Sequence, residues 1–129
     1  MPLLFVMVGG ALGSAARYLT GRATLAWFGP DFPYGTLAVN LVGGLLMGVL
    51  AAALTRAGDL AEPWRLFLGV GVLGGFTTFS AFSLDVVTMI ERGALGTALF
   101  YALISVIGSV LALFAGLTAA RTLIEGAAA

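Results

Sequence analysis

The sequence predicts an all-α membrane protein with four transmembrane helices in each subunit. Of its 129 residues, 60% are hydrophobic and only 9% are charged, whereas a soluble domain of this size carries roughly 25% charged residues. Too few polar groups remain to cover a water-facing surface. Four apolar stretches have the length of about 20 residues or more that a helix needs to cross the hydrocarbon core of a bilayer.

These stretches are separated by short polar or turn-rich connections, so residues 1–129 are expected to form one transmembrane domain. The predicted spans cover residues 3–20, 34–54, 66–90 and 95–123. The connections between them contain Gly29–Pro33, Arg56–Arg65 and Glu91–Gly93. The first stretch lacks a basic n-region, which favours a retained span over a signal peptide, and the tail from Glu125 to Ala129 is expected to fray.

The composition excludes several kinds of chemistry. The chain has no cysteine, no histidine and no lysine. Disulfides, thiolate metal sites and histidine-based catalysis therefore lack their groups, and no nucleophile–base pair suggests an enzyme. The net charge is zero, and no basic stripe suggests a nucleic-acid partner.

The arginines are spread almost evenly over the two ends of the predicted bundle. With four spans both termini lie on one side. The near-membrane arginines of that side are Arg56, Arg65 and Arg121, and those of the other side are Arg17, Arg22 and Arg92. The positive-inside bias that normally fixes orientation is therefore almost absent. The balance is either an accident of small numbers or the mark of a chain that inserts in both orientations and pairs as an antiparallel dimer.

Small residues recur at fourfold spacing in the first two spans, as Gly9 and Gly13 and as Gly44 and Gly48. Such pairs let helix backbones approach closely in lipid. They can serve packing inside one subunit or contact between two subunits, and the spacing alone does not decide between these.

Arg17 and Asn40 are strongly polar side chains that fall inside the first two predicted spans. Arg17 lies near the end of the first span, where it either snorkels to the interface or forms a positive wall in a vestibule that concentrates anions. Asn40 lies about one-third of the way into the second span. Its amide either bonds to another helix or turns its NH₂ donor toward an ion path, since amides in lipid need partners.

The third span contains a stretch, Gly74–Ser83, that weakens a helix. Two glycines and two β-branched threonines fall near its middle. We expect the helix to break there, since the alternative is an intact helix with a Gly/Ser/Thr packing face. Non-helical backbone at membrane depth must be buried in protein or line a cavity, where its carbonyls can bind a cation and its amides an anion.

Aromatic rings and hydroxyls follow this stretch. Phe79 and Phe82 are three residues apart and share a helix face, and their positive ring edges can touch a small anion. Ser80 and Ser83 supply hydroxyls in the same region. Because phenylalanine also faces lipid in many membrane proteins, the rings alone are a weak signal.

The fourth span carries a polar stripe at positions i, i+4 and i+8, formed by Tyr101, Ser105 and Ser109. The hydroxyls either bond back to their own helix or form a ladder of donors along a narrow path, and Leu113 ends the stripe. Asp85 is the one acid inside a span. It can pair with an arginine, lie near the interface or cap backbone donors.

Together these residues resemble the Fluc (CrcB) fluoride channel family. Three segments carry the resemblance: GGALGSAARY at 9–18, GTLAVNLVG at 35–43 and GGFTTFSAFS at 74–83. The third is the most specific, and the resemblance covers nearly the whole chain.

The resemblance implies a dual-topology, antiparallel homodimer with two fluoride pores, its partners being fluoride, lipid and a second copy of the chain. A small single-unit chain of this kind fits a bacterial inner membrane. It implies a structural Na⁺ at the dimer centre, held by the carbonyls of Gly74 and Thr77 from both subunits. The fluoride pathway that it implies, with the neighbouring hydroxyls included, consists of Arg17, Asn40, Thr78, Phe79, Ser80, Phe82, Tyr101, Ser105 and Ser109. Two departures from the family pattern are Asp85, where Glu is usual, and Leu113, where the polar track usually continues.

The predicted function is passive, selective conduction of F⁻ that lowers cytoplasmic fluoride. The main alternative is a small dual-topology multidrug exporter, which needs a membrane-embedded carboxylate. The first span has no acid, so Asp85 is the only candidate. A second alternative is a non-transporting membrane subunit of a larger complex.

Overall fold

The computed structural model describes residues 1–128 and consists of helices joined by short connections. Four helical runs are long and apolar enough to cross a membrane, which confirms the predicted all-α fold with four candidate spans. The elements are α1 (Pro2–Phe28), α2 (Tyr34–Leu54), η1 (Gly58–Leu60), α3 (Ala61–Trp64), the π-helix η2 (Arg65–Leu73), α4 (Gly74–Phe76), α5 (Ser80–Glu91) and α6 (Leu95–Ala128).

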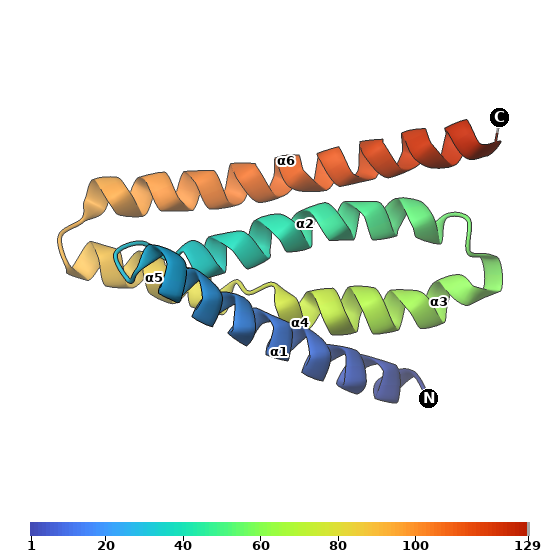
Figure 1. Ribbon diagram of the computed structural model, residues 1–129, viewed down its shortest axis with the longest axis horizontal. Helices are drawn as coiled ribbons and strands as arrows, with labels where there is room; N and C mark the ends of the chain where they lie inside the picture. Colours follow the sequence, from blue (N-terminus) through green and yellow to red (C-terminus); the bar gives the residue numbers. More distant parts are fainter. Residues whose placement is uncertain (129) are drawn as a thin grey trace.

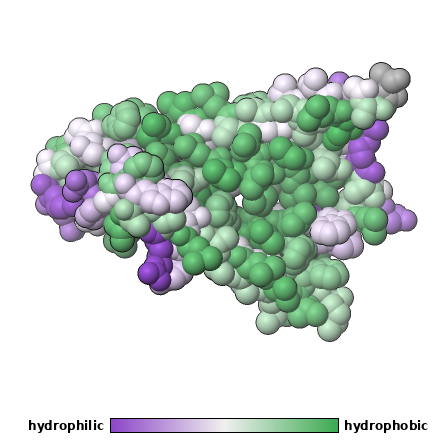
Figure 2. All heavy atoms as spheres, viewed as in Figure 1, coloured by the Kyte–Doolittle hydropathy of each residue, from purple (hydrophilic) through white to green (hydrophobic). Residues whose placement is uncertain are grey.

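The runs are arranged side by side as an elongated bundle (Figure 1). Both termini and the α2–η1 connection lie at one end, and the α1–α2 and α5–α6 connections lie at the other. Helix α2 packs along α6, and α1 packs against η2 and α4. The surface in Figure 2 is apolar along the middle and carries its most hydrophilic residues toward the two ends, as expected for a protein solvated by lipid.

Helix α1 is longer than predicted, because nothing in residues 21–28 stops it. It ends at Gly29, whose φ of 81° only glycine adopts readily and whose N–H donates to the Leu25 carbonyl at 2.9 Å. Pro30 then prevents further helix. Arg17 therefore lies well inside the helix rather than near its end, which corrects the sequence-based placement. α6 is helical as far as Ala128, through the tail that was predicted to fray from Glu125, and Ala129 lies outside the described residues.

The third run changes helix type several times. It passes from 3₁₀ and α turns into a nine-residue π-helix, and then into one turn of α-helix that ends at Phe76. Thr77 has extended backbone (φ −81°, ψ 158°), and helix resumes only at Ser80. The thin segment between α4 and α5 in Figure 1 is this interruption, residues 77–79. The Thr77 hydroxyl donates to the Leu73 carbonyl at 2.9 Å, so a side chain competes with the backbone where the helix ends.

The fourfold-spaced glycines pack inside the subunit. A Cβ on Gly9 would meet the Phe67 carbonyl of η2, and one on Gly48 would meet the Leu113 carbonyl of α6. A Cβ on Gly44 would lie 2.8 Å from the Ser109 carbonyl oxygen. Of the two interpretations left open by the spacing, these contacts support packing within one subunit, so the glycine pairs are no argument for a dimer.

Candidate functional site

The interruption in the third run is held by the side chain of Asn40, on the neighbouring helix α2. The Asn40 Nδ2 donates to the Thr78 carbonyl at 3.0 Å, and the Thr78 N–H donates to Asn40 Oδ1 at 2.8 Å. One amide group therefore satisfies both backbone groups of a residue that lies outside any helix. Unpaired backbone groups are costly in an apolar medium, so this pair stabilises the interruption.

Two N–H groups that would continue the helix are diverted to side chains. In an unbroken α-helix, Thr78 would donate to the Gly74 carbonyl and Ala81 to the Thr77 carbonyl. Here Thr78 donates to Asn40, and Ala81 donates to the Thr78 hydroxyl at 3.2 Å. The carbonyls of Gly74 and Thr77 have therefore lost their helical donors, and these are the two carbonyls for which the sequence resemblance implies a cation.

Arg17 reaches the same region from α1. Its Nε donates to the Gly75 carbonyl at 3.0 Å, a carbonyl that Phe79 would otherwise use in a continuous helix. The arginine also lines a cavity of about 460 Å³, together with Arg22, Tyr18 and Thr78, and we call this the arginine cavity. Arg17 thus both supports the interruption and faces an open space.

A second cavity, of about 390 Å³, lies between α2, the interruption, α5 and α6. We call it the interhelical cavity. Six of the residues predicted from the sequence to line an ion pathway line it together: Asn40, Thr78, Phe79, Phe82, Ser105 and Ser109. Leu113 lines it as well, beside Met47, Val106 and Val110, which the sequence analysis did not single out.

The two phenylalanines of this cavity differ in exposure. Their ring centroids are 5.6 Å apart with the planes inclined at 45°. Phe82 is 9% exposed, whereas Phe79 is 76% exposed on the single subunit. The pair therefore spans the distance from the protein core to the surface of the subunit.

Ser105 presents a buried hydroxyl to the interhelical cavity. Its Oγ is the one buried side-chain polar atom without a hydrogen-bond partner in the part of the chain that the structure describes. The proposed back-bond to its own helix, one of the two interpretations of the stripe, is therefore not formed at this residue. Buried hydroxyls are nearly always paired, so this donor is available to a bound ion or water.

Besides Arg17, two of the predicted residues lie apart from the interhelical cavity. Ser80 is exposed, and its Oγ is 3.4 Å from the Thr78 hydroxyl. Tyr101 is completely buried and packs on Phe82 with ring centroids 5.2 Å apart. The Tyr101 hydroxyl donates to Asp85 Oδ2 at 3.0 Å. None of the three roles considered for Asp85 anticipated this partner, although a buried tyrosine hydroxyl usually requires one.

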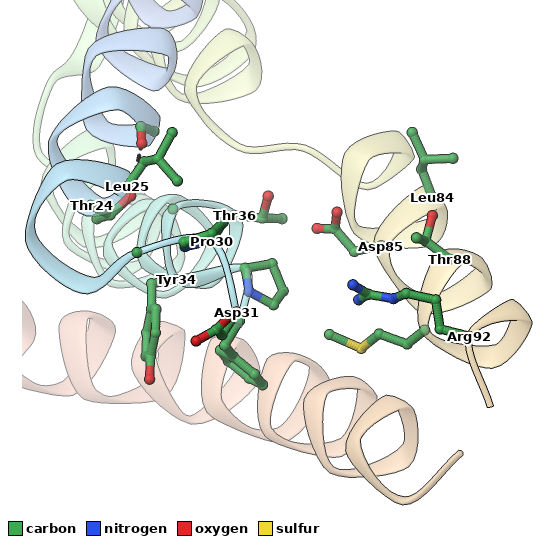
Figure 3. Close-up of a pocket in the computed structure, with 16 residues that line it drawn as sticks. Thr24, Leu25, Pro30, Asp31, Tyr34, Thr36, Leu84, Asp85, Thr88 and Arg92 are labelled. Atoms are coloured by element: carbon green, nitrogen blue, oxygen red, sulfur yellow. Dashed lines mark hydrogen bonds between the residues drawn. The ribbon is translucent and has the colours of Figure 1, made fainter. Parts of the chain in front are cut away.

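A third cavity, of about 400 Å³, lies where α1, α2, α5 and their connections meet, at the end of the bundle away from the termini. We call it the loop-end cavity. Its polar lining includes Asp31, Thr36, Asp85, Thr88 and Arg92 (Figure 3). Thr36 and Thr88 were not predicted to line a site, because single threonines in apolar helices carry no signal of their own.

The fold and these cavities define a small multi-pass membrane protein with a donor-lined internal space. The chain belongs to the CrcB family: the family model described as "CrcB-like protein, Camphor Resistance (CrcB)" matches residues 4–117. A protein of Phenylobacterium zucineum named "Fluoride-specific ion channel FluC" is 60% identical over 120 residues, covering 92% of this chain and 94% of the relative. Proteins of the same name from Caulobacter sp. (61% identical, 92% and 94% covered) and Agrobacterium fabrum (52%, 94% and 97%) are also similar.

Proposed function

We propose that this protein is a fluoride-selective channel that exports F⁻ passively across the membrane and lowers cytoplasmic fluoride. The observation that carries the proposal is the interhelical cavity, where the Asn40 amide, the Phe79–Phe82 pair and the unpartnered Ser105 hydroxyl converge. The names of the similar proteins, which are fluoride-specific ion channels, point to the same ion.

The chemistry of the cavity suits a small, strongly hydrated anion. Amide N–H, hydroxyl and aromatic ring-edge groups can replace water around fluoride without a fixed positive charge that would trap it. Conduction requires binding that is favourable but weak enough for release. A membrane potential that is negative inside drives an anion outward by about 2.3 kcal/mol per 100 mV, so export of fluoride needs no energy-coupling site. The protein is a channel and not an enzyme, in agreement with its family and with the names of its relatives.

The working unit that we propose is an antiparallel, dual-topology homodimer with two pores, in the bacterial inner membrane. With Arg17 inside the bundle, three arginines (Arg56, Arg65 and Arg121) face two (Arg22 and Arg92) at the other end, and this small difference supports insertion in both orientations. Phe79 is 76% exposed on one subunit, and an anion path along its ring edge needs a second protein wall. A partner copy lying across this face supplies that wall.

The interruption at residues 77–79 lies at membrane depth in this proposal, because it is flanked on both sides by long stretches of the apolar third run. Its free carbonyls then need ligands. Gly74 and Thr77, whose helical donors are diverted to Asn40 and Thr78, would hold a structural Na⁺ at the dimer centre. Unwound backbone carbonyls are the groups that coordinate Na⁺ inside membrane proteins, and the ion would tie the two interruptions together.

The alternative of a proton-coupled multidrug exporter depends on Asp85. That carboxylate accepts a hydrogen bond from Tyr101 and lines the loop-end cavity, together with Arg92. An exporter of cationic drugs would bind its substrate at a free membrane-embedded carboxylate. Because Asp85 is hydrogen-bonded to Tyr101 and shares its cavity with a cationic side chain, the structure favours the channel over the exporter. The alternative of a non-transporting subunit predicts a constant foreign partner in crosslinks made in native membranes, whereas the channel predicts a self-dimer.

The test is ion efflux from liposomes that contain the purified protein, with F⁻ or Cl⁻ as the only permeant anion. We expect rapid F⁻ efflux and Cl⁻ efflux near the protein-free background. Absence of F⁻ efflux from vesicles that contain folded dimer would end the proposal.

The Na⁺ site has a separate readout. Thermal unfolding of the detergent-solubilised dimer should shift to higher temperature in Na⁺ than in an equal concentration of N-methylglucamine, since a ligand that binds only the native state stabilises it. Identical unfolding curves in the two salts would remove Na⁺ from the proposal without affecting the fluoride pathway.

A further inference from the structure

The loop-end cavity is linked by contacts to the interhelical cavity. Asp85 lines the loop-end cavity and accepts a hydrogen bond from Tyr101. The Tyr101 ring packs on Phe82, with centroids 5.2 Å apart, and Phe82 lines the interhelical cavity. The buried Tyr101 side chain therefore separates the loop-end cavity from the buried end of the phenylalanine pair and contacts a lining residue of each cavity.

The charges that line this cavity are unusual for the mouth of an anion pathway. Two are carboxylates, Asp31 on the α1–α2 connection and Asp85 on α5, and the only cationic side chain in the lining is Arg92. Two carboxylates would repel an approaching anion. Arg92 thus offsets one of the two negative charges at this mouth.

Arg92 forms no ion pair with Asp31 or Asp85 within the described part of the chain. In the described part of the chain, the only ion pair within 4.0 Å joins Glu62 and Arg65 at the other end of the bundle. Arg92 caps the C-terminus of α5, and its guanidinium projects into the cavity in Figure 3. The first turn of α2 also lines the cavity at Gly35 and Thr36, and its free N–H groups add partial positive charge.

We propose that the loop-end cavity is an entrance to the fluoride pathway and that Arg92 is the residue that makes it accessible to anions, by offsetting the field of Asp31 and Asp85. This inference rests on the proposed function, since it assigns an entrance to the same pathway. A charged group at the mouth of a narrow site raises the local concentration of its counter-ion and the rate of its arrival. Arg92 acts on the approach of the ion and does not bind it inside the pore.

The experiment measures F⁻ efflux from liposomes at low ionic strength for the wild type and for Arg92→Gln, Arg92→Lys and Asp31→Asn/Arg92→Gln. Potassium isethionate serves as the inert salt. We expect Arg92→Gln to slow efflux by roughly tenfold, the lower range of electrostatic steering effects. Arg92→Lys should keep most of the flux, and removal of one carboxylate in the double variant should restore a large part of it.

Salt provides the second readout. The Debye length falls to about 3 Å at 1 M salt, so the difference between wild type and Arg92→Gln should shrink there. Arg121→Gln is the matched control, because Arg121 is exposed on α6 far from this cavity, and its flux should equal that of the wild type. Unchanged flux in Arg92→Gln at low salt, or a double variant no faster than Arg92→Gln, would overturn the proposal. Failure of the proposed function would give a different result, because the wild-type protein itself would then show no F⁻ efflux.

Discussion

Asn40 and Thr78 exchange two hydrogen bonds, of 3.0 and 2.8 Å, between a helix and the non-helical backbone beside it. The two residues are 38 positions apart in the chain. The Asn40 amide thereby satisfies the N–H and the carbonyl of Thr78, which in an α-helix would bond to the preceding and following turns. The geometry of the interhelical cavity depends on this pair, because the two hydrogen bonds fix the backbone position of Thr78. That position in turn sets where Phe79 and Phe82 enter the cavity.

Asn40→Ala should destabilise the protein and abolish fluoride flux. It leaves the N–H and the carbonyl of Thr78 without their partner, and each unpaired buried group costs about 1–3 kcal/mol. Thermal unfolding in detergent and liposome efflux measure the two effects. The control is Thr122→Ala, which removes an exposed hydroxyl bonded only to its own helix. An Asn40→Ala protein with unchanged unfolding temperature and flux would show that the pair has no such role.

Phe79→Ile and Phe82→Ile separate ring chemistry from packing. Isoleucine keeps an apolar side chain but has no positive ring edge, so both variants should lose fluoride flux by at least about tenfold. Phe82→Ile should also lower stability, by an amount on the order of 1 kcal/mol for an imperfect core replacement. Phe79 is exposed on the subunit, so its replacement should leave the fold of the subunit intact. Wild-type flux in either folded dimer would exclude that ring from the pathway.

Leu113→Ser tests whether the apolar end of the interhelical cavity limits conduction. Leu113 continues the i, i+4 stripe of Ser105 and Ser109 and lines the same cavity. Apolar constrictions hinder ions by dewetting, so a hydroxyl there should raise fluoride flux between about twofold and tenfold, a barrier change of up to about 1.4 kcal/mol. Leu111→Ser, on an exposed face of α6, is the matched control. Equal or slower flux in Leu113→Ser would show that the barrier lies elsewhere.

Gly48→Ala should destabilise the subunit, because the added Cβ would meet the Leu113 carbonyl of α6. Overpacking of this kind costs about 1–3 kcal/mol. Gly96→Ala is the opposite case: its Cβ would meet nothing within 4 Å, and alanine is the better helix former by about 1 kcal/mol. Unfolding temperatures should therefore fall for the first variant and rise or stay level for the second. The reverse order would contradict the close α2–α6 packing.

The sequence predicted much of the fold because lipid leaves few choices. Four long apolar stretches dictate four helices, and α2 has the predicted bounds of Tyr34 and Leu54. The end of α1 was missed because residues 21–28 are neither apolar enough for a span nor broken by proline, and helix simply continues to Gly29. The π-helix in η2 was not predicted; it packs closely against Gly9 and Gly13 of α1, a contact between two helices that the sequence of one helix does not encode.

The sequence indicated several residues that line the candidate site, but not the hydrogen bonds that these residues make with other helices. Periodicity related Ser105 to Ser109 and Phe79 to Phe82, and the family resemblance placed both pairs in one pathway; in the structure they line one cavity. Pairings across the bundle, such as Asn40 with Thr78 and Tyr101 with Asp85, depend on how the helices are placed in three dimensions, which periodicity along one helix does not encode. The same limit hid the loop-end cavity, whose lining comes from three helices and their connections.

The most direct test of the central claim is the current through the reconstituted protein in a planar bilayer with a fluoride gradient and a proton gradient set independently. Passive conduction through the interhelical cavity predicts a current that reverses at the equilibrium potential of F⁻ and does not move when the proton gradient is changed. A reversal potential that follows the proton gradient, or a folded dimer that carries no fluoride current, would contradict the account.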